Sequence, residues 1–249
     1  MKVTILGSGP SYGMPSLTRG FGDCDPNNPK NVRFRSAVLL SDKGTQILFD
    51  TPPEIRLQLL GVKNRKLDAL CYTHLHYDHT GGADDVNKMV QDQKRTLDVY
   101  AQKQDMDYFK KHQAYIFNDK CYHLHEIQFY KAFKVNHLSI LPIKQNHDDI
   151  LSVGYRVGNF AFSTDVRRMD GRAWEALMGV ETWVLGGVSY KKNKKHVALD
   201  EAMEWIDKIH PKRVFLTHIG AHMDYDTLCK NLPKNIRPAY DRMVLNIKT

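Results

Sequence analysis

Three histidines and an aspartate crowd into six positions of one short stretch, THLHYDHTGG. In an extended segment, residues two apart point the same way, so His74 and His76 can bind one cation from the same face. Asp78 and His79 follow where the chain turns, and their different directions suit a second cation beside the first. Imidazole nitrogens with carboxylate oxygens are typical zinc ligands, and manganese or iron suits a site with more oxygen. A lone His-x-His pair is often just two solvated side chains, but the full pattern indicates a metal site.

Further metal-capable side chains follow apolar runs that are typical of strands. Asp165 comes directly after NFAFST, His218 after RVFLT, and His147 a few residues after LSILPIK. Strand ends of a packed sheet are where loops converge to build a site. Each residue also has an ordinary interpretation, as a helix cap for Asp165, a strand-end histidine for His218 and a loop histidine for His147. Their repeated position favours one shared site.

The elements that would position these residues are short strands and amphipathic helices. Early apolar runs are joined by tight turns such as Asp42-Lys43-Gly44, which suits antiparallel pairing, and later runs alternate with helical patterns. No low-complexity segment, repeat or linker divides the chain. One domain over residues 1–249 is therefore expected, with an α/β or α+β fold whose sheets are covered by helices. The expected strands are 2–8, 35–41, 45–50, 67–73, 137–144, 153–157, 159–164, 181–187, 213–218 and 243–247, and the expected helices are 53–61, 105–113, 171–179 and 198–210.

Composition excludes several classes of protein. The 249 residues are 42% hydrophobic but contain no apolar run of about 18 residues, so no membrane span is expected. The opening MKVTILGSGP is typical of a first strand and not of a signal peptide. The four cysteines are far apart and form no CxxC pair, which argues against a disulfide framework and favours a cytoplasmic location. The net charge of +8 favours anionic partners, and the run KKNKK at 191–195 is ordinarily a solvated loop.

The stretch THLHYDHTGG resembles the signature of the metallo-β-lactamase-fold hydrolases. The remaining ligand positions of that superfamily occur in the same order, in QNHDDILSVGYRV, FSTDV and FLTHIG. The resemblance implies a four-layer αββα sandwich that holds two divalent metal ions, zinc or manganese, at one sheet edge. The implied ligands are His74, His76 and His147 for the first ion, Asp78, His79 and His218 for the second, and Asp165 for both.

A narrower resemblance covers nearly the whole chain. It is to the branch that contains the phosphoribosyl cyclic phosphodiesterase of phosphonate breakdown, and it rests on GSGPSYGMP, NPKNVRFRS, FDTPPEIRLQLL, SVGYRV, STDV and LPKNIRPAYDRM. In that branch a histidine shortly before the last βα unit acts with the metal-site aspartate in proton transfer. The matching residue is His196, the expected proton donor to the leaving alkoxide, and Asp78 is expected to orient the attacking water. Without the resemblance, His196 is equally well a solvent-exposed residue at a helix N-terminus.

One departure from that branch concerns a further, structural zinc. Relatives in the branch carry three cysteines after the opening glycine loop and a histidine three residues past the last metal ligand. This chain has Arg19, Phe21 and Cys24 at the cysteine positions and Ala221 at the histidine position. His222, one residue further on, is a candidate active-site or surface residue. We therefore expect two metal ions per chain.

Hydrolysis of a phosphodiester is the activity that these resemblances imply, with a small anionic, cyclic or nucleotide-like molecule as substrate. Arg33, Arg35 and His222 are weaker candidates for contacts to substrate, and packing or surface salt bridges explain the arginines equally well. One alternative is an RNA-processing endonuclease like the tRNA 3′-end nuclease, although the insertion at 101–135 is short for that family's long arm. A metal-containing protein that only binds is the other. The sequence leaves a monomer and a homodimer both open.

Overall fold

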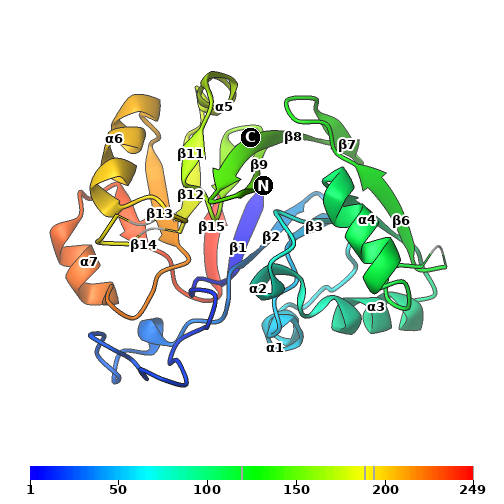
Figure 1. Ribbon diagram of the computed structural model, residues 1–249, viewed down its shortest axis with the longest axis horizontal. Helices are drawn as coiled ribbons and strands as arrows, with labels where there is room; N and C mark the ends of the chain where they lie inside the picture. Colours follow the sequence, from blue (N-terminus) through cyan, green and yellow to red (C-terminus); the bar gives the residue numbers. More distant parts are fainter. Residues whose placement is uncertain (119, 188, 193, 249) are drawn as a thin grey trace.

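Two β-sheets pack face to face at the centre of the molecule, and helices cover both outer faces (Figure 1). The computed structural model describes residues 1–118, 120–187, 189–192 and 194–248. The expected four-layer αββα sandwich is confirmed by this arrangement. The helices are α1 (Ile55–Leu60), α2 (Tyr77–Thr80), α3 (Ala83–Asp92), α4 (Lys103–His112), α5 (Gly171–Leu177), α6 (Leu199–Ile209) and α7 (Tyr225–Asn231), with a short 3₁₀ turn η1 (Pro29–Asn31).

The first sheet contains the N-terminal strands together with the last strand of the chain. Its order is β15-β1-β2-β3-β4-β5-β6, antiparallel from β15 to β3 and parallel from β3 to β6. The turn from β2 to β3 places Lys43 and Gly44 at φ values of 44° and 86°, a left-handed pair that suits a tight hairpin. The antiparallel pairing expected there is confirmed. The strands are β1 (Lys2–Gly7), β2 (Ala37–Asp42), β3 (Thr45–Phe49), β4 (Ala69–Cys71), β5 (Leu97–Ala101), β6 (Tyr122–Glu126) and β15 (Met243–Asn246).

The second sheet carries the later strands. Its order is β11-β8-β9-β10-β12-β13-β14, with β7 paired to β8, and the pairs from β10 to β14 are parallel. Parallel strands end at the same edge, which brings the loops that follow them together. The strands are β7 (Phe133–Val135), β8 (Leu138–His147), β9 (Ile150–Val157), β10 (Phe160–Ser163), β11 (Arg168–Met169), β12 (Thr182–Gly186), β13 (Arg213–Thr217) and β14 (Ile236–Pro238).

Three apolar cores hold the layers together. Between the sheets, the Phe49 ring packs against Tyr155 and Phe162 at centroid distances of 5.2 and 6.0 Å. The second core lies between the first sheet and α1, α3 and α4, and the third lies between the second sheet and α5, α6 and α7. Trp183, fully buried in the third core, donates its indole N–H to Ser163 Oγ at 3.1 Å. Both sheets are thus anchored on two faces, which fixes the edge where their loops meet.

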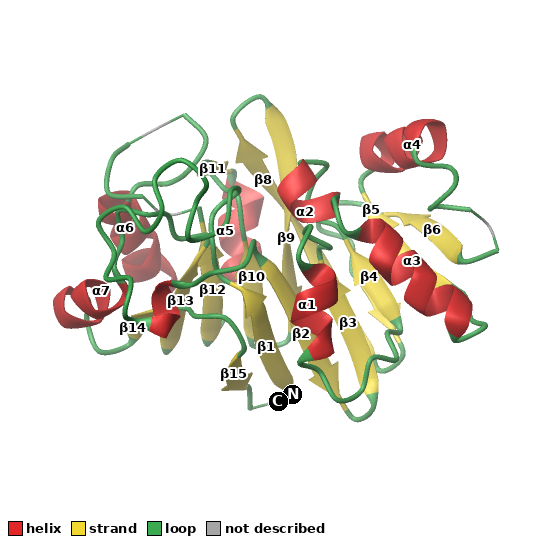
Figure 2. Cartoon of the chain, turned by 90° about the horizontal axis from the view of Figure 1, so that it is seen from below, coloured by secondary structure: helices red, strands yellow, loops and turns green. Residues whose placement is uncertain are grey.

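The long segment between β1 and β2 lies against the C-terminal part of the chain, beside α7 (Figure 1). Its backbone is tied at several points, including Ser8 O, which accepts from Ile219 N at 3.0 Å, and Asp23 N, which donates to Ala221 O at 2.8 Å. The two chain ends also lie together, as Figure 2 shows, with the Met1 amino group 3.1 Å from Ile247 O. The segment between β1 and β2 and the residues after β13 therefore lie side by side although they are distant in sequence.

Two further features bear on the expectations from composition. All four cysteines, which are Cys24, Cys71, Cys121 and Cys229, are free thiols. Among the described residues, no helix combines the length and the apolar character needed to cross a lipid bilayer.

Candidate metal centre

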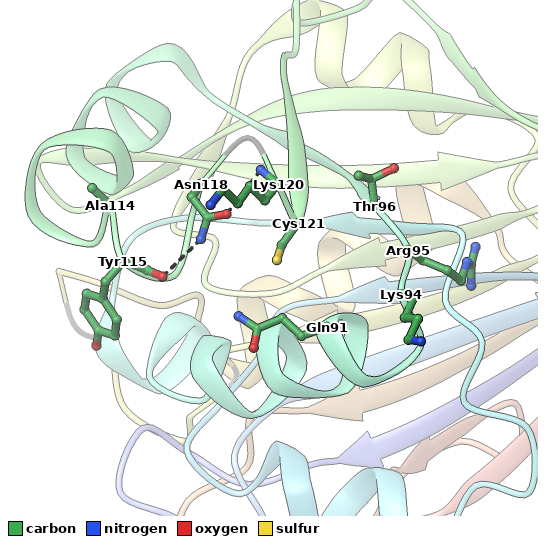
Figure 3. Close-up of a pocket in the computed structure, with 9 residues that line it drawn as sticks. All are labelled: Gln91, Lys94, Arg95, Thr96, Ala114, Tyr115, Asn118, Lys120 and Cys121. Atoms are coloured by element: carbon green, nitrogen blue, oxygen red, sulfur yellow. Dashed lines mark hydrogen bonds between the residues drawn. The ribbon is translucent and has the colours of Figure 1, made fainter.

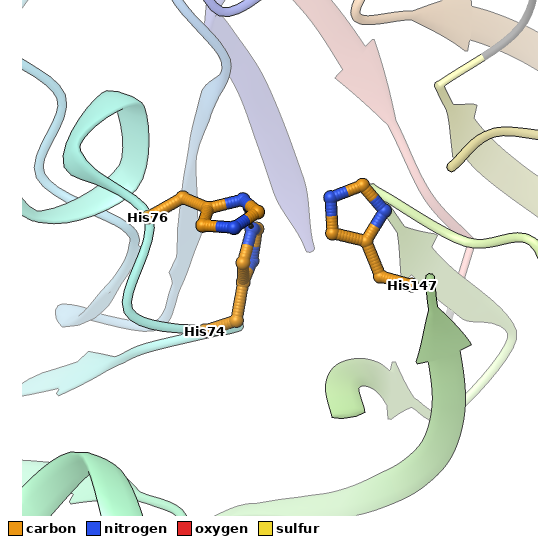
Figure 4. A group of neighbouring side chains, drawn as sticks. All are labelled: His74, His76 and His147. Carbon is orange, nitrogen blue, oxygen red and sulfur yellow. Dashed lines mark hydrogen bonds between the residues drawn. The ribbon is translucent and has the colours of Figure 1, made fainter. Parts of the chain in front are cut away.

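The residues predicted as metal ligands gather at one edge of the sandwich. His74 follows β4, Asp165 follows β10 and His218 follows β13, while His147 is the last residue of β8. Figure 4 shows the rings of His74 and His76 turned toward the same space as the ring of His147, which comes from the other sheet. The edge is formed by both sheets, so residues far apart in sequence meet there.

Among the described residues, the seven predicted ligands form overlapping groups whose donor atoms lie within 4.8 Å of one another. Asp165 belongs to two of the groups, as a carboxylate shared between two ions would. The groups are His74 with His76 and His147, Asp78 with His79 and His218, His74 with His79 and Asp165, and His147 with Asp165 and His196.

Three residues at the strand ends adopt the left-handed backbone conformation. Asp50 after β3, Asp165 after β10 and His218 after β13 have φ values of 65°, 50° and 58°. This conformation is uncommon for residues other than glycine and concentrates at functional sites. The bend at Asp165 is held by Ser152 Oγ, which donates to the Asp165 carbonyl at 2.7 Å. Thr164 Oγ1 donates to Asp165 Oδ2 at 2.7 Å and so orients the carboxylate itself.

A chain of hydrogen bonds fixes the tautomer of His74. Thr73 Oγ1 donates its one proton to Asp50 Oδ2 at 2.8 Å, so it must accept from His74 Nδ1, which lies 3.0 Å away. His74 Nε2 is then unprotonated, and it lies 2.9 Å from His76 Nδ1. His147 is oriented in the same way, because its Nδ1 donates to Lys195 O at 2.9 Å. In both rings the other nitrogen presents a lone pair to the site.

The Nε2 atoms of His79 and His218 lie near the carboxylates of Asp78 and Asp165 without forming a hydrogen bond to either. His79 Nδ1 donates to Asp50 Oδ2 at 2.7 Å, while His79 Nε2 lies 3.2 Å from Asp78 and 3.1 Å from Asp165. His218 Nε2 lies 3.5 and 3.4 Å from the same two carboxylates. Both Nε2 atoms are buried and have no hydrogen-bond partner within the part of the chain that the structure describes. Ring nitrogens and carboxylate oxygens that converge without hydrogen-bond geometry fit divalent cations between them.

The electrostatics of the site agree with this fit. Burial opposes charge on Asp165, yet His218 and His79 outweigh it and hold the pKa of Asp165 well below its usual value. Burial likewise disfavours an imidazolium at His79, but Asp165, Asp50 and Asp78 together raise the pKa of His79 well above the ordinary value. Without a metal ion, a proton on His79 balances the negative charge that the metal ion would otherwise neutralise. Metal binding would release this proton. Burial lowers the pKa of His74, which keeps that ring neutral as a ligand must be.

Asp50 and Thr73 are site residues that the motif search missed. Asp50 is fully buried and accepts hydrogen bonds from His79 Nδ1, Thr73 N and Thr73 Oγ1 at 2.7 to 2.8 Å. Such carboxylates orient ligating histidines and raise their basicity. Asp50 ends the expected strand 45–50, so the rule that polar residues at strand ends build the site would have found it.

His196 lies beside the predicted ligands. Its Nδ1 is 3.7 Å from Asp165 Oδ1, and its ring centroid is 4.9 Å from that of His147 and 5.2 Å from that of His218. Gly187 makes room for it, because a Cβ there would lie 2.6 Å from His196 Nδ1. Burial, and then the charge of His218, lowers the pKa of His196 to about 3. The ring is therefore neutral near pH 7 until an anion such as a phosphate raises its pKa.

The two arginines named as candidates for substrate contacts are used inside the fold. Arg33 is 1% exposed, and its guanidinium donates to Ile219 O at 3.2 Å and to Met223 O at 2.9 Å. Arg35 forms an ion pair with Glu54, and its Nε donates to a backbone carbonyl at 2.7 Å. The structure does not bring either arginine into the metal centre.

His222 lies in an exposed chain of side chains near the site. A guanidinium only donates, so His222 Nε2 accepts from Arg19 Nη1 at 3.1 Å. His222 Nδ1 then carries the proton and donates to Asp23 Oδ2 at 2.6 Å. His222 and Asp23 both line a cavity that reaches the metal centre.

The place where the narrower resemblance would put a structural zinc has, among the described residues, a donor set that does not fit a metal. Met14, Cys24 and Ala221 form a small apolar cluster with Phe21 against it. Cys24 has the one thiol of this cluster among the described residues, and that thiol donates to Ala221 O at 3.5 Å. Burial raises the pKa of Cys24, which disfavours the thiolate that zinc requires.

Two of the concavities on the described part of the surface differ in their relation to the metal centre. One, of about 720 Å³, reaches the metal centre, since His196 and His218 are part of its wall. The other, of about 1240 Å³, is shallow and lies among the end of α3 and the segment before β6, where Gln91, Tyr115 and Lys120 line it (Figure 3). None of the described residues that line the second is a predicted ligand.

Comparisons with known proteins agree with this geometry. The sequence model of the family described as "Beta-lactamase superfamily domain" matches residues 45–219. A crystal structure of a diphosphatase from the PhnP family superposes with a TM-score of 0.92 at 28% identity, over 99% of this chain and 98% of that one. An octanoyltransferase of Porphyromonas gingivalis is 29% identical over 97% of this chain, which spans 50% of that protein. A ribonuclease Z of Clostridioides difficile is 35% identical over 80 residues, 30% of this chain and 26% of its own length.

Proposed function

We propose that this chain, a metal-dependent hydrolase of the β-lactamase superfamily, cleaves phosphodiesters of small, nucleotide-like molecules. The observation that carries the proposal is the pair of three-donor groups, one of His74, His76 and His147 and one of Asp78, His79 and His218, with the carboxylate of Asp165 within ion-pair distance of members of both. Two ions held side by side suit the in-line displacement of an alcohol from phosphorus. We propose zinc or manganese as these ions, and residues 1–249 as one domain, since β15 returns to pair with β1.

The chain's own residues divide into two roles in this proposal. One set holds the two ions, and it consists of His74, His76, His147, Asp78, His79, His218 and Asp165. Divalent ions at this place would supply the positive charge that acidifies water and neutralises phosphoryl oxygens. Asp78 would accept a hydrogen bond from the attacking water, and His196 would donate a proton to the leaving oxygen. Asp50 and Thr73 keep the ligand rings in the required tautomers.

The relatives support phosphate chemistry over acyl transfer. The diphosphatase matches the full length of this chain at 28% identity, and both a diphosphate and a phosphodiester are cleaved at phosphorus. The octanoyltransferase alignment leaves half of that protein without a counterpart here, so its name gives no argument for acyl transfer by this chain.

RNA processing is the second candidate, and the local match to ribonuclease Z favours it. The two functions differ in their dependence on salt. A nuclease that grips a tRNA precursor contacts many phosphates, so its kcat/KM falls steeply as salt rises. A small diester contacts few basic side chains, so its kcat/KM changes little as salt rises.

We expect turnover of small nucleotide diesters with shallow salt dependence and little cleavage of a tRNA precursor. Rates on cyclic nucleotides, nucleotide diesters and a tRNA precursor, each at several salt concentrations and with zinc or manganese, test this. Strongly salt-dependent cutting of the precursor, with no activity on any small diester, would establish the nuclease instead. If the metal-loaded protein turns over none of these substrates, this result would support the alternative of a metal-containing protein that only binds.

The metal content is expected to be close to two ions per chain and not three. Seven donors at the metal centre suffice for two ions, whereas the cluster around Cys24 offers one buried thiol. Elemental analysis of gently purified protein measures the content, and Cys24→Ala provides the comparison. A third ion that is lost on this substitution would contradict the expectation.

A further inference from the structure

The cavity beside the metal centre is larger than a phosphate needs. Its volume of about 720 Å³ lies within the range of roughly 300–1,000 Å³ that holds whole small-molecule ligands. His196 and His218 form part of its wall, so a group bound in the cavity is continuous with a phosphate at the metal centre. The rest of the wall therefore contacts the part of the substrate that is attached to that phosphate.

Tyr12 enters this cavity from a well-anchored turn. Gly13 N donates to Pro10 O at 2.8 Å across the turn, and Arg35 Nε donates to Ser11 O at 2.7 Å. The Tyr12 hydroxyl lies over Gly220, because a Cβ built on that glycine would be 3.1 Å from it. The side chain is nevertheless 46% exposed. Arg35 thus supports an aromatic side chain that faces the cavity.

Tyr190 enters from the loop that precedes α6. Ser189 at its base bridges to Ala198, and Leu199 N donates to Ser189 O at 2.8 Å, which closes the loop. Tyr190 is also 46% exposed. Two half-exposed tyrosines from separate segments therefore line one cavity.

The other lining groups are mixed in character. Ser11, Asp23, Ser189 and His222 offer hydrogen-bonding side chains, whereas Pro10 and Met223 present apolar surface and Gly187 and Gly220 present no side chain. Sugar hydroxyls packed against the apolar part of the wall lose hydrogen bonds to water without replacement, which is costly. A nucleobase can place its ring faces against the tyrosines and the apolar surface, and its polar edge toward the hydrogen-bonding side chains. Lys191, also in the wall, adds positive charge that favours an anionic substrate.

We propose that this cavity binds a nucleobase, with Tyr12 and Tyr190 as the side chains that contact its ring. The inference rests on the proposed function, since it places the phosphate of the same substrate at the metal centre. It narrows the substrate class to phosphoesters that carry a nucleoside, and it sets base-free sugar phosphates apart as poor substrates.

The test compares two substrates that differ only in the base. Adenosine 2′,3′-cyclic phosphate and methyl riboside 2,3-cyclic phosphate share the ribose and the reacting phosphate. The ratio of their kcat/KM values is expected to fall about tenfold in Tyr12→Ala and in Tyr190→Ala, because stacking on an aromatic side chain is worth that much per base. The phenylalanine variants should keep the ratio. Tyr115→Ala, which removes a 71% exposed tyrosine from the separate concavity of Figure 3, is the matched control.

Equilibrium binding separates this inference from the proposed function. Calorimetry with AMP and with ribose 5-phosphate, neither of which is a diester, needs no turnover. Tighter binding of AMP, lost in the alanine variants, supports the nucleobase site even if the protein hydrolyses no diester. The inference is overturned if AMP and ribose 5-phosphate bind equally. It is also overturned if the alanine variants weaken both substrates alike, or if Tyr115→Ala changes the ratio as much.

Discussion

Replacing Asp165 by alanine is expected to reduce hydrolysis by about 10³-fold or more, since metal-ion catalysis is worth several kcal/mol. The carboxylate of Asp165 lies within ion-pair distance of His79, His147 and His218, so its loss removes a negative charge from both donor groups. The occupancy of both metal positions should therefore fall together. The remaining histidines, no longer balanced by this anion, should also bind protons less readily.

Metal analysis and turnover of a small diester measure the two effects on the same preparation. Asp105→Ala is the matched control, because Asp105 is equally buried, at 1% exposure on α4, and lies outside every donor group found among the described residues. Full metal content and turnover in Asp165→Ala would show that this residue serves only the backbone bend after β10.

Replacing His196 by alanine should leave the metal content intact and lower turnover by roughly 10²–10⁴-fold on alkyl esters, as expected for the loss of a general acid. The effect should depend on the leaving group. An alkoxide needs a proton, whereas nitrophenolate leaves without one, so the loss should shrink on nitrophenyl substrates. His196 lies 3.7 Å from Asp165 and forms part of the cavity wall. This position would let it reach the leaving oxygen of a substrate bound there.

The measurement is kcat for a nitrophenyl diester and for an alkyl diester in the wild-type protein and in His196→Ala. His125→Ala controls for the loss of a histidine, because His125 is 43% exposed on the first sheet and stacks on Tyr100 away from the site. Equal losses on both substrates would assign His196 to substrate binding. Loss of metal would assign it to the ligands, consistent with its proximity to His147.

The local pattern of the chain predicted the strands that position the site better than the elements that cover it. Apolar runs such as 159–164 and 213–218 are buried on both faces, so hydrophobicity alone marks them. Helix α3 was missed because its sequence, ADDVNKMVQD, is mostly polar and buries little beyond Ala83, Val86 and Val90. Strand β6, YHLHE, lies at a sheet edge with exposed histidines, and no run of apolar residues identifies it. Elements at the margin of a core bury few apolar residues, so hydrophobicity alone does not mark them.

The environment of single side chains was out of reach for a different reason. Arg33 is buried because carbonyls of Ile219 and Met223 turn toward it, and these lie more than 180 residues away in sequence. No local pattern encodes that approach. Asp50 is the opposite case, since its position at a strand end was visible and only its partner His79 depends on the fold.

Because the site is divided between the two sheets, the stability of the fold depends on the supply of metal. His74, His76, Asp78 and His79 follow strands of the first sheet, and His147, Asp165 and His218 belong to the second. The group of His74, His76 and His147 and the group of Asp78, His79 and His218 each join both halves of the sandwich, and the unfolded chain cannot assemble them. By mass action, free metal at 100 times its dissociation constant adds about 2.7 kcal/mol to the free energy of unfolding. The amount of folded protein then depends on metal availability. A shortage of metal would lower the amount of folded protein as well as the activity.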